Sequence, residues 1–435
     1  MPVGRGNLGI QIQYVKLPGP PVHRKLFNYA YIRFLGFIMR NVAIVGVGIS
    51  RFGVRNDVRI DELAWESVKD ALNDAGIEQK DIEFCSVGTF GSFNAEILPA
   101  VLCCDYCNLR FKGTLRTEAA CATGSAAFFI GFNAVSSGFA DIVLVLGVEK
   151  MCESPTPVAV EFIGRSANYF WEFENFGVTF PGYYALHATA YMNRYGAKEE
   201  DLARVAVKNH YYGSLNPKAH LRNRITIEDA LKSRYVAWPL KLYDCCPISD
   251  GSAAVILASE EAARKLTDTP IWVRGIGVSN DSANMSRRSG FTGLDAAVDA
   301  ARKAYRMAGI EHDDPLRYID VANVHDCFTI AEIMAYEDLN FARRGEGYLL
   351  LREEQTYIGG KIPVNVDGGL KAKGHPLGAT GVGMIVELTK QLRRQVENGR
   401  QAPIVKGNAL AHNVGGTGHY CYITILSLEK PKWGG

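Results

Sequence analysis

The sequence predicts an α/β fold built from two similar halves, each with a sheet flanked by helices. An internal repeat gives the first indication: both halves run strand, helix, strand, and both helices end in Ala-Gly-Ile, at residues 75–77 and 308–310. Apolar residues recur every three or four positions in these helices, and the glycine stands where a helix commonly ends. Strands that alternate with helices are typical of mainly parallel sheets covered on both faces. We therefore expect a duplicated fold with pseudo-twofold symmetry.

The elements of each half follow from their hydrophobic patterns. Short apolar runs predict strands, and longer amphipathic stretches predict helices. In the first half we expect strands at residues 42–48, 82–90 and 141–147, and helices at 64–76 and 121–137. In the second half we expect strands at 272–278, 318–324, 404–411 and 419–428, and helices at 294–308, 328–341 and 377–395.

These patterns place the first half at residues 39–270 and the second half at residues 271–435. An aromatic, Pro- and Asn-rich stretch at about 150–250 interrupts the first half, with helices expected at 181–195 and 200–213. We expect a loop-domain insertion there that contacts the substrate. Residues 1–38 carry five Lys or Arg and no Asp or Glu. We expect this basic extension to lie outside the fold, with a transit peptide as the alternative.

The composition is that of an ordinary globular protein and excludes several functional classes. Of the 435 residues, 47% are hydrophobic and 22% are charged, and the net charge is only +2. This balance gives no reason to expect binding to nucleic acid or to a membrane surface. No apolar run approaches the roughly 20 residues of a membrane-spanning helix.

The ten cysteines form no regular disulfide framework. Several lie inside apolar runs, which favours reduced thiols in a cytoplasmic protein. Cys103, Cys104 and Cys107 include a C-x-x-C spacing, as in a metal site or redox pair. A structural zinc needs four ligands, and no second pair completes the set. We prefer local packing of reduced thiols and predict no metal site.

A Gly-x-Gly pattern follows the first strand, in Val45-Gly-Val-Gly-Ile-Ser-Arg51, and hints at a dinucleotide fingerprint. Arg51 stands where the third glycine belongs, and no acidic residue ends the second strand. NAD binding requires both features, so we reject it.

The segment around Cys121 carries the strongest chemical signal. Cys121 follows an extended run and precedes small residues that suit the start of a closely packed helix. A sulfur at a helix N-terminus meets unpaired amide N–H groups and the helix dipole, which stabilise a thiolate. The same N–H groups can receive an oxyanion. A packed, unreactive cysteine is the alternative.

Three further motifs place histidines and a second thiol at the ends of expected elements. His325 and Cys327 follow a strand, where ligand sites gather in parallel sheets, although a hydrogen-bonded core histidine is the alternative. Gly374-His375-Pro376 precedes a helix and suits a positioned base, although a glycine-dense loop can also bind phosphate. His412-Asn413-Val-Gly415-Gly416 lies between the last two strands, and its glycines permit close approach of backbone N–H groups to a ligand, or form a tight hairpin.

Taken together, these motifs resemble those of the thiolase superfamily over about residues 40–430. Four of them match in order: the Cys121 turn, His325-Asp-Cys-Phe, Gly374-His-Pro, and a glycine turn before the last strand. The chain is most similar to the branch of archaeal-type acetoacetyl-CoA thiolases and sterol-carrier-protein-type thiolases. This branch includes the benzoylsuccinyl-CoA thiolases of anaerobic aromatic degradation. The resemblance implies a five-layered α-β-α-β-α sandwich of two five-stranded halves with a loop-domain insertion.

The resemblance also implies roles for the reactive side chains. Cys121 would take the acyl group as a thioester, and His375 would remove its proton and help bind the first oxyanion. His325 replaces the asparagine that most thiolases place in that oxyanion hole. Most thiolases carry a second catalytic cysteine where this chain has Asn413. The sterol-carrier type is similar in placing that acid/base thiol at the position of Cys327.

Backbone groups complete the implied site. The N–H groups of Gly415 and Cys121 would form the second oxyanion hole. Asn413 and Gly374 are counted with the oxyanion and substrate-binding residues. No metal is implied, and coenzyme A is expected as a substrate, with no permanently bound cofactor.

The expected activity is CoA-dependent thiolytic cleavage of a β-ketoacyl-CoA, or the reverse Claisen condensation, through an acyl-cysteine. An acetoacetyl-CoA-type substrate is the first expectation. The aromatic segment 168–184 fits an insertion core or dimer contact, or a pocket for a bulky acyl group. An aryl substrate such as benzoylsuccinyl-CoA is therefore the alternative. A decarboxylating ketoacyl synthase and a non-catalytic acyl-CoA-binding scaffold are further alternatives, and the combined thiols and histidines argue against the scaffold.

The resemblance finally implies partners. Archaeal-type thiolases commonly associate with a small zinc-ribbon/OB-fold protein that helps to hold CoA, sometimes together with a hydroxymethylglutaryl-CoA synthase. The chain shows no obvious cluster of its own for the CoA phosphates, which is compatible with such a partner. A homodimer or tetramer with isologous contacts is also expected.

Overall fold

The computed structural model describes residues 39–432, apart from residues 92, 94 and 398. Every helix and strand named here lies within residues 40–432. The expected basic extension at residues 1–38 lies outside the described residues. Within the described part, no helix is both long and apolar enough to span a lipid bilayer.

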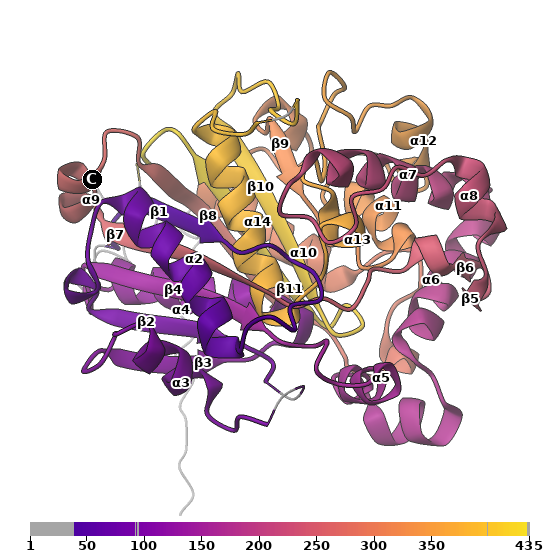
Figure 1. Ribbon diagram of the computed structural model, residues 1–435. Helices are drawn as coiled ribbons and strands as arrows, with labels where there is room; N and C mark the ends of the chain where they lie inside the picture. Colours follow the sequence, from indigo (N-terminus) through magenta and orange to yellow (C-terminus); the bar gives the residue numbers. More distant parts are fainter. Residues whose placement is uncertain (1–38, 92, 94, 398, 433–435) are drawn as a thin grey trace, which may run out of the picture. The chain divides into compact units, whose positions relative to one another are not determined.

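Nine strands form one sheet in the order β3-β2-β4-β7-β1-β8-β11-β10-β9 (Figure 1). Their bounds are β1 (Val42–Ile49), β2 (Phe84–Gly88), β3 (Gly113–Thr117), β4 (Ile142–Glu149), β7 (Gly251–Ser259), β8 (Ile271–Asn280), β9 (Val321–Asn323), β10 (Asn408–Gly415) and β11 (Tyr420–Ser427). A separate two-stranded sheet pairs β5 (Tyr235–Ala237) with β6 (Leu240–Lys241).

The large sheet contains the same strand path twice, which confirms the expected duplication. The first half has the order β3-β2-β4-β7-β1, and β9, β10, β11 and β8 take the places of β2, β4, β7 and β1 in the second. A single parallel bridge between Ala322 and Val364 occupies the place of β3. The second half therefore has four strands and a bridge, where five strands were expected. The halves meet where β1 pairs with β8 over two residues.

The sheet is mixed, so the expectation of mainly parallel strands is wrong. β2 runs parallel to β3 and β4, and β9 runs parallel to β10, but β7 and β11 are antiparallel to both of their neighbours. β10 and β11 are joined by a short turn, which enforces antiparallel pairing. The insertion starts and ends at the same end of the sheet, because Glu149 at the end of β4 pairs with Gly251 at the start of β7.

With each half of the large sheet counted as one layer, the helices form the other three layers of the expected five. In the first half α2 (Ile60–Ala75) packs on the outer face with α3 (Pro99–Tyr106) beside it. In the second half α10 (Asp295–Ala308) packs on β8 and β11, with α11 (Thr329–Asp338) beside it. The central helices α4 (Thr123–Ser136) and α14 (Leu377–Leu392) contact each other, and α14 contacts strands of both halves.

Glycines in β1 and β8 allow the outer helices to lie unusually close to the sheet. A Cβ atom at Gly48 would lie 2.1 Å from the carbonyl oxygen of Ser67 in α2. A Cβ atom at Gly277 would lie 1.8 Å from the carbonyl oxygen of Ala300 in α10. The Gly-x-Gly pattern that hinted at a dinucleotide fingerprint therefore serves helix packing, and it does so in both halves.

The insertion between β4 and β7 gathers to one side of the sheet (Figure 1). It contains α5 (Thr156–Gly164), the π-helical turn η4 (Tyr169–Glu174), α6 (Phe180–Tyr195), α7 (Glu199–Leu215) and α8 (Ile227–Lys232), and α6 and α7 match the two predicted helices. The remaining helices are α9 (Glu260–Leu266), α12 (Gly347–Arg352) and α13 (Gly369–Ala372). Short 3-10 turns lie at η2 (Gln79–Asp81), η3 (Ala120–Ala122), η5 (Leu242–Asp244), η6 (Met285–Arg287) and η7 (Pro315–Arg317).

Candidate active site

Cys121 lies in the turn η3, immediately before the central helix α4. The Thr123 hydroxyl closes this turn: it accepts a hydrogen bond from the amide of Ala119 at 2.9 Å and donates to the carbonyl of Ala120 at 2.6 Å. Ala120 has φ of 51°, a left-handed conformation that costs free energy for any residue with a Cβ. The fold thus tolerates local strain to place Cys121 at the start of a helix.

The Cys121 thiol is protonated in the free site, which corrects the expectation of a resting thiolate. Burial raises its pKa to about 12. The amides of Gly416 and of Cys121 itself contact the sulfur and favour the thiolate, but they do not offset the burial. The nucleophile therefore needs a base that takes its proton during the reaction.

Apolar side chains surround the Cys121 sulfur. The cluster draws on the loop after β2, on the insertion and on the start of α14. Its buried members besides Cys121 are Phe93, Met151, Ala159 and Leu377, with Phe90, Phe162, Ile163 and Ile248 packed against them. Three of these side chains come from α5, so the insertion does contribute to the surroundings of the nucleophile.

His375 is held in one orientation by the backbone and by Thr380. Gly374 has φ of 113°, and a Cβ atom there would lie 2.7 Å from Ser249 Oγ, so glycine is required before His375. His375 Nδ1 lies 2.7 Å from Thr380 Oγ1, and that hydroxyl donates to the carbonyl of Pro376 at 2.9 Å. Because its proton is used there, Thr380 accepts from His375 Nδ1–H. His375 Nε2 is therefore the unprotonated nitrogen and can act as a base.

His325 has the opposite arrangement of its ring proton. It follows β9, and its backbone amide donates to His412 Nδ1 at 3.3 Å. Asn413 Nδ2 lies 3.1 Å from His325 Nδ1 and 3.2 Å from the carbonyl oxygen of Cys121. A carbonyl oxygen can only accept, so the amide nitrogen of Asn413 faces both partners and His325 Nδ1 also accepts. His325 Nε2 then carries the proton and can donate.

The three reactive groups meet at one point. The Cys121 sulfur and one ring nitrogen of each of His325 and His375 lie within 4.8 Å of one another. The two rings are 5.1 Å apart and nearly perpendicular. Burial lowers the pKa of His375 to about 3 and that of His325 well below its ordinary value. The free site thus holds a neutral thiol, a neutral base and a neutral donor.

A thiol and two imidazoles are also ligands that zinc prefers. In the observed hydrogen-bond network, however, His325 Nε2 carries a proton and has no lone pair to offer a metal. The arrangement suits proton transfer and oxyanion binding better than metal coordination.

Cys327 is buried near Cys121; burial raises the pKa of its thiol well above the ordinary value, and the neighbouring Cys246 and Cys121 thiols raise it further. The Tyr184 hydroxyl faces its sulfur, and Tyr184 stacks on Phe328 with ring centres 4.6 Å apart. The Cys327 carbonyl accepts from the amide of Cys246 at 2.9 Å. The predicted second thiol is therefore in the site.

The glycine turn after β10, which contains Gly415 and Gly416, lies beside Cys121. The amide that contacts the Cys121 sulfur belongs to Gly416. Gly415, the predicted donor, ends β10 so close to the Cys121 turn that a Cβ atom would lie 2.3 Å from the carbonyl oxygen of Ala119. Asn413 faces Cys121 and His325 from the same strand, as described above.

Glu149 supports the site from the end of β4. Its carboxylate accepts hydrogen bonds from the amides of Phe90, Gly91 and Gly378 at 2.8–2.9 Å. It therefore fixes the loop after β2 and the first turn of α14 together. Burial raises the pKa of this carboxyl group to about 7.

Asp326, the second residue of the His-Asp-Cys-Phe motif, supports the site from the other half. It accepts from the amides of Leu370 and Lys371 at 2.7 and 3.2 Å, and from Asn209 Nδ2 at 2.7 Å. These bonds join the segment after β9 to α13 and to α7 of the insertion. The loop that ends at His375 is thereby fixed to the strand end that carries His325.

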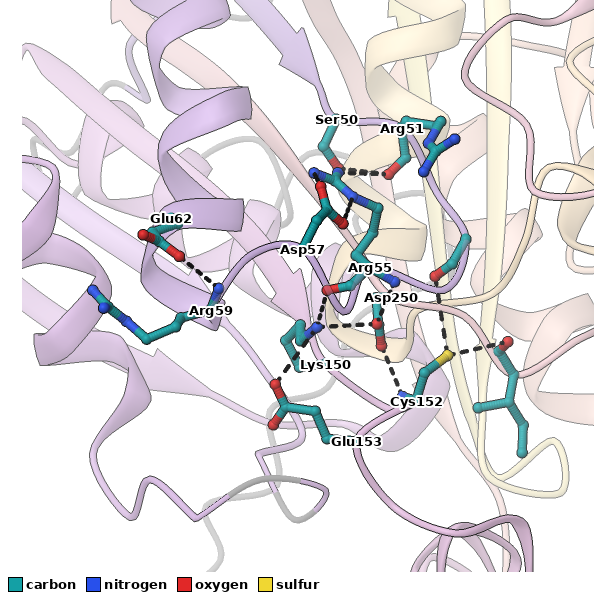
Figure 2. A network of polar contacts seen from close by, with 12 residues as sticks. Ser50, Arg51, Arg55, Asp57, Arg59, Glu62, Lys150, Cys152, Glu153 and Asp250 are labelled. Atoms are coloured by element: carbon teal, nitrogen blue, oxygen red, sulfur yellow. Dashed lines mark hydrogen bonds and ion pairs between the residues drawn. The ribbon is translucent and has the colours of Figure 1, made fainter.

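A buried ion pair anchors the segment beneath His375. Lys150 and Asp250 lie 3.2 Å apart and are both almost fully buried, and Asp250 also accepts from the amides of Arg55 and Cys152 (Figure 2). The next residue back, Ser249, accepts from the amide of His375 at 3.3 Å, and its hydroxyl lies 2.9 Å from His220 Nδ1. This pair therefore holds the segment on which the His375 backbone rests.

The aromatic segment 168–184 divides into two parts. Phe170, Trp171 and Phe176 are exposed on the insertion surface, whereas Tyr183 and Tyr184 are buried in α6. Tyr184 is one of several site residues that were not predicted from the sequence. The others are Glu149, Ser125, Thr380 and Ser249. For Ser125 a signal existed, since it lies one helical turn after Cys121, and Thr380 follows His375 by five residues.

Comparison with known families identifies both halves. The family described as "Thiolase, N-terminal domain" matches residues 42–261, and the family described as "Thiolase C-terminal domain-like" matches residues 277–428. Together these matches cover most of the chain.

Two relatives are similar over nearly their whole length. An acetyl-CoA acetyltransferase of Methanothermobacter thermautotrophicus is 42% identical, with 89% of this chain and 100% of that protein covered. The benzoylsuccinyl-CoA thiolase subunit BbsB of Thauera aromatica is 34% identical, with 87% and 95% covered. Human sterol carrier protein 2 is 33% identical, with 91% and 73% covered.

A solved structure shares the fold. A chain of the "Ltp2-ChsH2(DUF35) aldolase" is 26% identical, with a TM-score of 0.77, and 90% of this chain and 98% of that chain are covered. The family matches, the relatives and the meeting of Cys121, His325 and His375 agree. The chain belongs to the thiolase family and is an acyltransferase.

Proposed function

We propose that the chain cleaves a β-ketoacyl-CoA with CoA, or condenses two acyl-CoA molecules in reverse, through an acyl group carried on Cys121. One observation carries this proposal: the Cys121 thiol and one ring nitrogen of each of His325 and His375 lie within 4.8 Å of one another. These are the three groups that covalent acyl transfer requires.

The first half-reaction uses Cys121 and His375. His375 Nε2 takes the thiol proton as the sulfur attacks the keto carbon. The bond between the keto carbon and the α-carbon then breaks, the acyl group stays on sulfur, and acetyl-CoA leaves as its enolate. The amides of Cys121 and Gly416, which already contact the sulfur, are placed to bind the oxygen of the attacked carbonyl.

The departing enolate needs a donor at oxygen and an acid at carbon. His325 Nε2–H supplies the donor as a neutral imidazole. Cys327 supplies the proton to the α-carbon, and Tyr184 faces its sulfur. The resulting Cys327 thiolate then removes the proton of an incoming CoA thiol, whose sulfur attacks the acyl-cysteine and releases the second acyl-CoA. Cys121 leaves as a thiolate and takes its proton back from His375, so protons and acyl groups balance over the cycle.

CoA enters as a substrate, and the proposal needs no permanently bound cofactor. Residues 218–224 run beside the loop that ends at His375, because the amides of His220 and Leu221 donate to the carbonyls of Lys373 and Ala372. Arg222 and Arg224 are exposed there and can meet the CoA phosphates. This basic segment was not recognised in the sequence.

An acetoacetyl-CoA-type substrate is favoured, because the similar protein from Methanothermobacter thermautotrophicus is an acetyl-CoA acetyltransferase. The apolar, aromatic surroundings of Cys121 and the similarity to BbsB favour a bulky aryl β-ketoacyl-CoA as the second candidate.

Assembly and location are also proposals. β3 is an edge strand, and Ile97, Leu98, Val101 and Phe111 are exposed on the segments flanking it, which supports a homodimer through this edge. The similar aldolase is named together with a DUF35 protein, which supports a small partner of this kind, with hydroxymethylglutaryl-CoA synthase as a further component. All ten cysteines are free thiols, which supports a reducing, cytoplasmic environment.

The first test follows the loss of acetoacetyl-CoA enolate absorbance on addition of CoA, for the wild type and for Cys121→Ser. Rapid loss that the substitution abolishes supports the proposal with a small acyl group. Loss only with an aryl β-ketoacyl-CoA supports the second candidate. Equal loss in both proteins contradicts the mechanism, because cleavage would then not require the Cys121 thiol.

A second pair of variants tests the acid. Cys327→Ala should lower kcat by about 10²-fold or more, as expected on loss of a general acid. Cys246→Ala, which removes a thiol on the neighbouring segment, should have little effect. If both variants keep wild-type turnover, Cys327 is not the acid, and a decarboxylating synthase mechanism gains support.

A further inference from the structure

We propose that Asn413 is a positioning residue that sets the tautomer of His325, and that Ser125 in turn fixes the orientation of Asn413. This inference rests on the proposed function, because it explains how His325 comes to be a neutral hydrogen-bond donor. It also replaces the expectation that Asn413 binds substrate or an oxyanion directly.

Every polar group of the Asn413 side chain is already engaged. Nδ2 donates to the carbonyl oxygen of Cys121 at 3.2 Å and to His325 Nδ1 at 3.1 Å. Oδ1 accepts from the Ser125 hydroxyl at 2.9 Å. The side chain is fully buried, and both amide protons are used. Asn413 therefore has no free donor for an oxyanion.

These three contacts leave the amide only one orientation. If the amide turned over, its oxygen would face the Cys121 carbonyl oxygen, and two acceptors would repel each other. The amide nitrogen would then face Ser125, and its hydroxyl would lose its acceptor. Breaking buried hydrogen bonds in this way is costly, so the observed orientation is strongly preferred.

The orientation of Asn413 decides where the His325 proton lies. An amide N–H that points at Nδ1 requires a lone pair there, and a neutral imidazole with a lone pair on Nδ1 carries its proton on Nε2. Burial disfavours the imidazolium, in which both nitrogens would be donors. A donating Nε2–H on an uncharged ring therefore depends on this single tautomer.

The two histidines are fixed by opposite kinds of partner. Thr380 presents an acceptor to His375 Nδ1 and leaves its Nε2 as a base. Asn413 presents a donor to His325 Nδ1 and leaves its Nε2 as a donor. His325 Nε2 and His375 Nε2 are both buried without a partner in the described structure, so both are available to substrate.

Asn413→Asp is the decisive variant. Aspartate has a similar shape but only acceptors, so His325 must place a proton on Nδ1. In the wild type, ¹⁵N NMR of histidine-labelled protein, assigned with His325→Gln, should show the proton on Nε2. In Asn413→Asp it should show protonation at Nδ1. The kcat should fall about 10²- to 10³-fold, as on loss of an oxyanion donor.

Two further variants keep the test independent of folding. Asn408→Asp puts a carboxylate at another buried asparagine of the same strand, and it should leave the His325 signals unchanged. Ser125→Ala keeps Asn413 but frees its oxygen, and it should give mixed tautomers and a fall in kcat of about tenfold, since one neutral hydrogen bond is lost.

The outcomes separate this inference from the proposed function. A wild-type His325 protonated on Nδ1 would overturn the inference, and so would unchanged His325 signals in both Asn413→Asp and Ser125→Ala. The NMR measurement needs no substrate. If Cys121→Ser remained fully active, the proposed function would fail even with the tautomer result intact.

Discussion

The two central helices begin in the same way but present different chemistry to the site. α4 starts two residues after Cys121, and α14 starts two residues after His375. Their first turns touch, since a Cβ atom at Gly124 would lie 2.7 Å from the carbonyl oxygen of Gly378. In the proposed mechanism, the first half thus supplies the nucleophile, and the second half supplies the acid–base groups.

The two reactive side chains are also held differently. Cys121 depends on backbone amides and on a turn strained at Ala120, with φ of 51°. His375 depends on a side-chain acceptor, Thr380, and on a glycine with φ of 113°. Duplication provided two equivalent helix N-termini. The N-terminus of α4 contributes amide N–H groups to the site, and the N-terminus of α14 positions the imidazole ring of His375.

The largest effect that tests this comparison is expected for His375→Ala. Loss of the base should lower kcat/KM about 10³-fold at pH 7. The pH profile should change as well. In the wild type the rate should be nearly flat around neutrality, because the pKa values of His375 and Cys121 are about 3 and about 12.

Without the imidazole, the rate should follow the fraction of free Cys121 thiolate, which rises about tenfold per pH unit below its pKa. Initial rates of thiolysis between pH 6 and pH 9 measure this directly. A profile that stays flat in His375→Ala would show that another group deprotonates Cys121.

Much of the fold was predictable because it rests on local pattern. Apolar residues recur every three or four positions in α2 and α10, which predicts helices. The apolar runs of β1 and β4 predict strands. The direction of β7 was not predictable, since it depends on where a long insertion returns the chain. The missing fifth strand of the second half depends on a single bridge to Val364.

The site residues likewise divide into those that a local sequence pattern predicts and those that depend on contacts between distant segments. Cys121 and His375 could be found, because reactive residues before helices have a recognisable local sequence. The hydrogen bonds of Asn413 join residues 88 and 292 positions away, which no spacing reveals. The protonation of Cys121 was also missed, because it depends on burial by distant segments, which outweighs the local amides.

The next largest effect is expected for Gly374→Ala. The new Cβ atom would meet Ser249 Oγ at 2.7 Å and displace His375 from Cys121. A misplaced base should lower kcat about 10²-fold. Gly309→Ala is the matched control, because Gly309 also has a positive φ, of 67°, but no atom within 4 Å of the added Cβ.

Both alanine variants should lose ~1 kcal/mol of stability through backbone strain. Only Gly374→Ala should lose activity beyond that. Steady-state thiolysis and thermal melting measured together separate the two effects. If the two variants were equally active, displacing His375 would not affect catalysis. That result would contradict the role of His375 as a base that works in one geometry.

The loss of stability at low pH should also come mainly from the second half. Burial lowers the pKa of His412 to about 3, whereas an unfolded imidazole titrates near ~6.5. Between these values the unfolded chain binds the proton and the folded chain does not, so stability is lost as the pH falls. From pH 7 to pH 5 this one group should cost ~2 kcal/mol.

His412→Gln keeps an acceptor for the His325 amide but cannot take up that proton. Denaturant unfolding at pH 7 and pH 5 should therefore show a smaller loss for the variant than for the wild type, by ~2 kcal/mol. An identical loss in the two proteins would place the acid sensitivity elsewhere.

Glu149 of the first half should respond in the opposite direction and more weakly. Its pKa is raised to about 7 by burial, above the ~4.3 of an unfolded glutamate, so the folded chain binds the extra proton between these values. Stability is then lost as the pH rises, by ~1 kcal/mol between pH 6 and pH 8. Glu149→Gln should reduce the alkaline loss by about this amount while leaving the acid loss of His412 in place; Asp326 and Asp338, whose pKa burial also raises to about 7, should cause the alkaline loss that remains. If Glu149→Gln instead reduced the loss of stability at low pH, the two halves would not titrate separately. They would be coupled through the first turn of α14, which Glu149 binds.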